Sequence, residues 1–129
     1  MAERSGDWMK QALRDLEAAE ENRKRGFHEW SCFIAQQGAE KAVKALLYKL
    51  SAVSWGHSVY ELLKLASKKI VVDEETIAAA KRLDRYYIPT RYPNSFDSGS
   101  PHDYFTSKDA DDALVCSKRI VEFCNSLLA

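Results

Sequence analysis

Residues 35–50 carry apolar side chains at helical spacing, and this pattern constrains the fold more than any other in the chain. The side chains recur every three to four residues, as they do on a helix that packs against a core. The set consists of Ala35, Ala39, Ala42, Val43, Leu46 and Leu50. Several members are small, and Gly38 lies among them, so a neighbouring helix can approach closely. The segment therefore predicts a tightly packed helix.

A second, polar set of side chains follows the same predicted helix. Gln36, Glu40 and Lys44 recur every four residues, and Gln37 and Lys41 lie beside them. Charged helix faces are usually solvated, and a Glu40–Lys44 pair on such a face contributes only about 0.2–0.5 kcal/mol. The alternative is a surface that binds a ligand or a partner. The segment alone leaves both interpretations open.

Length and charge limit the classes of protein to which the chain can belong. Its 129 residues suit one domain, residues 1–129, with a core of its own. The 19 Lys and Arg residues balance 19 Asp and Glu residues, so no net charge attracts nucleic acid or a membrane surface, and any anion site must be local. The sequence lacks an apolar run of about 20 residues and a signal-peptide pattern, so we expect no membrane span and a cytoplasmic protein.

Cysteines and histidines are placed unfavourably for a metal site. Three cysteines without C-x-x-C spacing, all in helical patterns, predict free thiols in a reducing compartment. None of the three histidines lies four residues from another histidine or a cysteine. We therefore expect no metal and no cofactor. His57, just before a predicted helix, is interpreted as a turn or capping residue.

The remaining patterns predict an all-α fold, a four- to five-helix up-and-down bundle with a long loop before the last helix. We expect helices at about 7–24 and 28–50. A short helix should begin after the N-cap Ser58, a fourth after Asp73 that ends at Pro89, and a last one after Thr106 or Ser107. Residues 88–105 contain the three prolines and show no periodicity, so they form the loop. Loops of this length are usually functional or disordered.

Residues 84–93 concentrate arginine, tyrosine and proline before that loop. A guanidinium group binds phosphate oxygens, and tyrosine rings offer stacking faces, so the segment is suited to a planar anionic ligand. The alternative is structural. Tyr87 and Tyr92 would then pack in the core or a dimer interface, and Arg91 would pair with an acid such as Glu40.

The order and spacing of five segments resemble the HEPN domains, named for higher eukaryotes and prokaryotes nucleotide-binding. The segments are residues 15–19, 33–47, 57–63, 83–93 and 109–110. The resemblance covers nearly the whole chain. It implies a four- or five-helix bundle that dimerises and works with a minimal nucleotidyltransferase in a toxin–antitoxin-like module. It also favours a ligand or partner surface for the polar set.

Many HEPN proteins are metal-independent RNases, whose site is an arginine followed four to six residues later by a histidine, supplied by both subunits of a dimer. Here Arg91 and His102 are separated by ten residues, and Pro93 and Pro101 prevent a continuous helix between them. The mismatch predicts little or no RNA cleavage. Tyr104 keeps the His-x-Tyr ending of RNase members, so a folded-back loop would still allow an RNase toxin that uses Arg91, His102 and Tyr104.

We therefore expect a non-catalytic, homodimeric subunit that binds a nucleotide such as ATP or GTP, or a partner. Lys44 and Arg91 would bind phosphate, and Tyr87 or Tyr92 would stack on a base. The full set of expected ligand-binding residues is Gln37, Glu40, Lys41, Lys44, Tyr87, Arg91 and Tyr92. The alternatives are the RNase toxin, which acts on RNA, and a purely structural dimerisation module.

Overall fold

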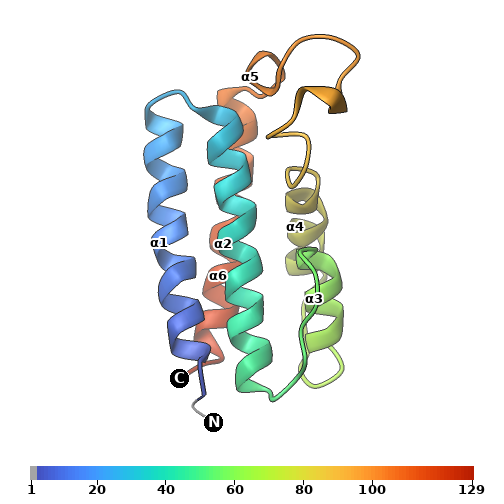
Figure 1. Ribbon diagram of the computed structural model, residues 1–129. Helices are drawn as coiled ribbons and strands as arrows, with labels where there is room; N and C mark the ends of the chain where they lie inside the picture. Colours follow the sequence, from blue (N-terminus) through green and yellow to red (C-terminus); the bar gives the residue numbers. More distant parts are fainter. Residues whose placement is uncertain (1–2) are drawn as a thin grey trace.

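The computed structural model describes residues 3–129 and contains only helices in that range (Figure 1). This confirms the predicted all-α bundle. The elements are α1 (Ser5–Lys24), α2 (His28–Lys49), α3 (Val59–Ala66), α4 (Glu74–Asp84), the 3-10 turn η1 (Pro93–Ser95), α5 (Pro101–Tyr104) and α6 (Ser107–Ser126). No helix among these residues combines the length and hydropathy that crossing a membrane requires.

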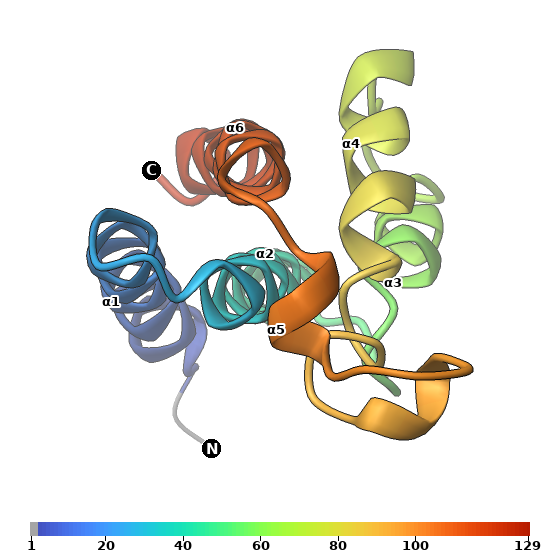
Figure 2. The same ribbon diagram turned by 90° about the horizontal axis from the view of Figure 1, so that it is seen from above.

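Helix α2 lies at the centre of the bundle. It packs against α1 and α6 on one side and against α3 and α4 on the other (Figures 1 and 2). After α2 the chain turns back along the bundle before α3 begins (Figure 1). This return brings His57 beside the middle of α2, where the polar side chains lie.

The contact between α1 and α2 is close because small residues occupy it. A Cβ atom at Gly38 would lie 3.3 Å from both the Ala12 carbonyl oxygen and Asp15 Cβ of α1. On the side of α6, the Ser117 hydroxyl donates a hydrogen bond of 2.7 Å to the carbonyl oxygen of Ala35. The tight packing predicted for the small residues of α2 is confirmed.

Three of the predicted N-caps are present. The side chains of Ser58, Asp73 and Thr106 accept hydrogen bonds from backbone N–H groups in the first turns of α3, α4 and α6.

The end of α4 differs from the prediction, because the helix stops at Asp84 rather than at Pro89. The backbone after it tightens into i→i−3 turns, and Tyr86 N donates to the Leu83 carbonyl. Asp84 also has a second function. Its carboxylate accepts hydrogen bonds from the backbone N–H groups of Val59 and Tyr60, at 2.8 and 3.0 Å, and so caps α3. The loop over 88–105 contains η1 and α5.

Candidate functional site

Glu40 is the centre of a polar network on α2. Glu40 is buried, with only 5% of its surface exposed. The carboxylate accepts hydrogen bonds from Lys44 Nζ at 3.0 Å and from Gln37 Nε2 at 3.2 Å. Both of its oxygens lie 3.3 Å from His57 Nδ1. The interpretation of this polar set as a solvated face is therefore wrong at Glu40, because the return of the chain after α2 covers it.

A second hydrogen-bonded link fixes the position of His57. Gln36 is 0% exposed, and its Nε2 donates to the His57 carbonyl oxygen at 2.8 Å. The Gln36 side-chain oxygen accepts from Gln37 Nε2, also at 2.8 Å. Side chains of α2 therefore contact both the backbone and the imidazole of His57. The carboxylate at Nδ1 favours the tautomer with the proton on that nitrogen, which leaves Nε2 as an acceptor. The His57 side chain is 57% exposed, so this second nitrogen is accessible to a ligand.

Aromatic rings connect His57 to Arg91. The His57 imidazole stacks on the Tyr87 ring, with centroids 5.0 Å apart and an interplanar angle of 18°. Arg91 Cζ lies 4.6 Å from the centroid of the same ring, 4.4 Å from that of Phe33 and 5.1 Å from that of Tyr92. Arg91 Nε donates to the Tyr87 carbonyl oxygen at 2.8 Å. The guanidinium is thus fixed by rings and backbone, and no carboxylate in residues 3–129 pairs with it.

The pairing of Arg91 with Glu40, one of the structural alternatives, does not occur. Glu40 is bound by Lys44, and the aromatic rings surround Arg91 instead. Within residues 3–129 the two NH₂ groups of Arg91 make no hydrogen bond, so they are free to bind an anion. A planar guanidinium with both of these groups uncommitted is suited to two parallel hydrogen bonds to phosphate oxygens.

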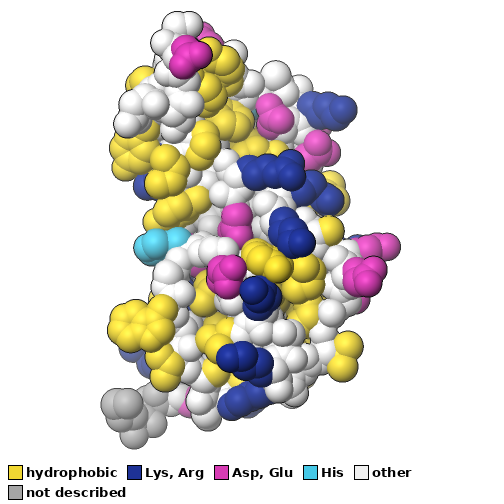
Figure 3. All heavy atoms as spheres, turned by 90° about the vertical axis from the view of Figure 1, so that its right-hand side faces the viewer, with side chains coloured by type: hydrophobic (Ala, Val, Ile, Leu, Met, Phe, Trp, Pro, Cys, Tyr) yellow, Lys and Arg dark blue, Asp and Glu magenta, His cyan; other side chains and the backbone are white. Residues whose placement is uncertain are grey.

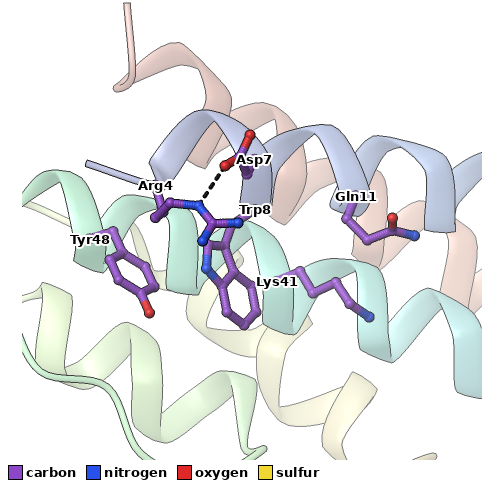
Figure 4. Close-up of a pocket in the computed structure, with 6 residues that line it drawn as sticks. All are labelled: Arg4, Asp7, Trp8, Gln11, Lys41 and Tyr48. Atoms are coloured by element: carbon purple, nitrogen blue, oxygen red, sulfur yellow. Dashed lines mark hydrogen bonds and ion pairs between the residues drawn. The ribbon is translucent and has the colours of Figure 1, made fainter. Parts of the chain in front are cut away.

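Lys41 lies apart from Arg91, in a groove between α1 and α2. Its Nζ pairs with Asp15 Oδ2 of α1 at 2.7 Å. The Trp8 and Tyr48 rings stack in this groove with centroids 5.7 Å apart. Figure 4 shows the Trp8 ring between Tyr48 and Lys41. The groove has a volume of about 380 Å³ and is lined by Arg4, Asp7, Trp8, Gln11, Lys41 and Tyr48.

The structure therefore divides the expected ligand-binding residues into three groups. Gln37, Glu40 and Lys44 form the polar network of α2, and Tyr87, Arg91 and Tyr92 form the aromatic cluster. Lys41 belongs to the α1–α2 groove. His57 was not among the expected residues, yet it contacts both of the first two groups.

The residues of the alternative RNase site are not brought together. His102 is exposed on α5, and no contact joins it to Arg91 within the described chain. The Tyr104 hydroxyl donates to the Ser98 carbonyl at 2.6 Å, and its ring stacks on Phe96. A capping box between Ser100 and Asp103 fixes this short helix. The loop thus packs on itself instead of carrying His102 to Arg91.

Two of the three buried thiols do not supply a nucleophile. Cys32, Cys116 and Cys124 are buried and free. Burial raises the pKa of Cys32 and of Cys124 to about 12, so both remain protonated at neutral pH. In the described residues, no three His, Cys, Asp or Glu side chains are grouped to hold a metal ion. The candidate site consists of Arg91, His57 and the aromatic rings around them.

The chain is similar to several proteins of one family. The family model of the HEPN domain matches residues 5–127. TT1696 from Thermus thermophilus is 38% identical, with a TM-score of 0.94 over 97% of this chain and 98% of that chain. The archaeal HEPN homologue ST0689 is also 38% identical, with a TM-score of 0.85 over 99% of this chain and all (100%) of that one.

Two further relatives are more distant in sequence. A HEPN domain protein from Thermotoga maritima is 34% identical, with a TM-score of 0.78 over 95% of this chain and 97% of that one. The protein named "Putative toxin MJ1304" from Methanocaldococcus jannaschii is 24% identical over 130 residues, which cover 94% of this chain and 86% of that protein. The family-model match over nearly the full length and the identities above 30% lead to one conclusion: this chain belongs to the HEPN domain family.

Proposed function

We propose that this HEPN protein is a nucleotide-binding subunit of a toxin–antitoxin-like module and that Arg91 binds a phosphate group of the nucleotide. The proposal rests on the surroundings of the Arg91 side chain. Its guanidinium is fixed by Tyr87 and Phe33 and has no carboxylate partner in the described chain. An arginine held in this way has already lost most of its side-chain entropy, which lowers the cost of binding an anion.

His57 supplies a second contact of the proposed site. Its ring lies on Tyr87, as does the guanidinium of Arg91, and the carboxylate of Glu40 orients it. The imidazole would donate to a phosphate oxygen when protonated or accept from a ribose hydroxyl when neutral. Tyr92, half-exposed beside Arg91, provides a ring face for a base.

The cellular setting is proposed from the relatives. One of them, MJ1304, carries a toxin name, and the HEPN resemblance implies a minimal nucleotidyltransferase as partner. We propose that this chain also works in such a module, as a homodimer in the cytoplasm. A reading frame for a small nucleotidyltransferase beside its own, with co-purification of the two proteins, would support the module; co-expression without association would contradict it.

The test of the site is calorimetric titration of ATP and GTP against the wild type and two Arg91 variants. Arg91→Ala removes a charge-assisted contact of about 1.5–3 kcal/mol and should weaken binding about ten- to a hundredfold. Arg91→Lys keeps the charge but not the planar fork, so it should recover only part of the loss. Arg14→Ala, which removes an exposed arginine of α1, is the control and should bind as the wild type does. Equal affinities for Arg91→Ala, or no binding at millimolar ligand, would overturn the proposal.

A second function has one specific observation in its favour, the Glu40–His57 pair. In a metal-independent RNase, His57 Nε2 would take the proton of a ribose 2′-hydroxyl, and the 2′-oxygen would attack phosphorus. The P–O5′ bond would break, the 5′-oxygen would take a proton from water, and a 2′,3′-cyclic phosphate would remain. Arg91 would stabilise the charge of the transition state.

Incubation with total RNA in EDTA separates the two functions. We expect little or no cleavage, in keeping with the arginine-to-histidine spacing. Robust cleavage that His57→Ala abolishes and His102→Ala preserves would establish the RNase with His57 as its base. Cleavage that requires His102 would instead show that the loop rearranges toward Arg91.

A further inference from the structure

The outer face of α3 and α4 carries a column of basic side chains. Lys64 and Lys68 come from α3 and the turn after it, and Lys81 and Arg85 from α4 and its C-terminal end. All four are exposed. Figure 3 shows Lys and Arg side chains following one another along this face, with some Asp and Glu side chains beside them. The protein has no net charge, so any attraction for an anion at this face comes from these four side chains and not from the molecule as a whole.

These basic groups are poorly neutralised. Among the described residues no carboxylate pairs with Lys68, Lys81 or Arg85, and Lys64 has only the exposed Glu61, at 3.8 Å. Asp84, the acid nearest in sequence to Arg85, is bound to the N-terminus of α3. An external anion would therefore meet little competition from within the protein.

Tyr60 joins the charges of the two helices into one surface. Lys64 Nζ lies 5.2 Å from the centroid of its ring, and Lys81 Nζ lies 4.9 Å from it. The face of an aromatic ring attracts each ammonium group. The two groups nevertheless repel each other, and an anion bound between them would relieve this repulsion. The site is thus built from two helices rather than from a single run of lysines.

The composition of the face indicates the chemistry of its partner. Protein–protein interfaces have an apolar centre and are depleted in lysine. On residues 59–85, Val71 is the one large apolar side chain that is exposed, and it lies in the turn between the helices. Lys and Arg contacts to phosphates dominate the binding of nucleic acids and do not depend on sequence. We propose that the α3/α4 column binds the phosphate backbone of a nucleic-acid strand.

The column ends beside the candidate site. Arg85 precedes Tyr87, the ring that contacts both His57 and Arg91, by two residues. The column and the nucleotide site are nevertheless separate surfaces, and either is able to bind its ligand without the other.

Fluorescence anisotropy with labelled 20-nucleotide RNA and DNA strands of the same sequence tests the proposal. The variant combines Lys68→Gln, Lys81→Gln and Arg85→Gln. It should bind both strands at least about tenfold more weakly at 50 mM salt than the wild type, and its plot of log affinity against log salt should be less steep by about 2. A separate variant, Arg91→Ala, should keep most of the affinity, because the column is distinct from Arg91.

The matched control combines Lys10→Gln, Lys24→Gln and Lys118→Gln, which are exposed on α1 and α6 and change the net charge equally. It should retain the wild-type affinity and salt dependence, and thermal melts should show both triple variants folded. An equal loss in the control, or no binding by the wild type at 50 mM salt, would overturn the proposal. Binding of polyglutamate as tight as that of the nucleic acids would also overturn it and would indicate an acidic protein partner.

Discussion

The imidazole of His57 and the carboxylate of Glu40 meet across 17 positions of sequence, with Nδ1 3.3 Å from both carboxylate oxygens. The pair connects the central helix to the segment that leads into α3. It also shares the carboxylate with Lys44, whose side chain is mostly buried.

We predict that Glu40→Ala destabilises the protein by about 3 kcal/mol, because it leaves the buried ammonium of Lys44 without its partner. Urea denaturation at pH 7 measures the loss. Glu17→Ala is the control, since it breaks an exposed pair with Arg14 and should cost no more than about 1 kcal/mol. A loss in Glu40→Ala as small as that in Glu17→Ala would mean that Lys44 finds water or another acceptor.

Gly38→Ala should destabilise the protein by about 1–2 kcal/mol, although alanine favours helices. The new Cβ would press on the Ala12 carbonyl oxygen and on Asp15 Cβ, both at 3.3 Å, and force α1 away from α2. Gly6→Ala is the matched control, because nothing lies within 4 Å of its Cβ position, and it should stabilise α1 by up to about 1 kcal/mol. Thermal and urea denaturation of both variants measure the change in the free energy of unfolding. A stabilised Gly38→Ala would show that the two helices separate easily.

The helices follow from local patterns, which is why the sequence predicts them. The apolar repeat of α2 and the caps Ser58, Asp73 and Thr106 act within a few residues of where they stand. The end of α4 differs from the prediction, and its last residue, Asp84, caps a helix 25 positions away in sequence. No local pattern reports such a contact.

The candidate site was only partly predictable for the same reason. Arg91 and Tyr87 lie close together in sequence, so the sequence alone indicates a segment suited to a planar anionic ligand. The role of His57 depends on the return of the chain along α2, which places it on Glu40. A histidine directly before an N-cap, together with a glutamate in the middle of a polar helix face, was the available signal. The contact between them is made by the tertiary fold, which the sequence pattern alone does not reveal.

The N-cap Asp73 should make the folding stability of the protein depend on pH. Hydrogen bonds from Thr76 lower its pKa from 3.8 to about 2, and the Arg119 guanidinium adds to the effect. A carboxylate with a lowered pKa in the folded state stabilises the protein above the unfolded pKa, and this stabilisation is lost as the pH falls through the folded value. The melting temperature of the wild type should therefore exceed that of Asp73→Asn at pH 6, and the gap should close between about pH 4 and pH 2. A gap independent of pH would show that the cap acts without its charge.

We predict a homodimer that covers the exposed face of α2. Trp30 and Tyr48 are 43% and 42% exposed, although they belong to the central helix. They are 18 residues apart, which is five turns at 3.6 residues per turn, so they lie on the same side of α2. Lys41, between them on this side, lines the groove that contains Trp8. Aromatic side chains aligned in this way are typical of an interface rather than of a solvated helix.

Sedimentation at tens of micromolar should therefore detect a dimer, because an interface of ordinary size is populated at that concentration. Tyr48→Glu places a charge on the proposed interface and should shift the equilibrium toward monomer at least tenfold. Val115→Glu introduces the same charge at an exposed position of α6, outside this face, and should leave the dimer intact. A monomeric wild type would contradict the prediction, and a dimer sensitive only to Val115→Glu would place the interface on α6. If Tyr48→Glu alone dissociates the dimer, the aromatic surface of α2 is what the second subunit buries.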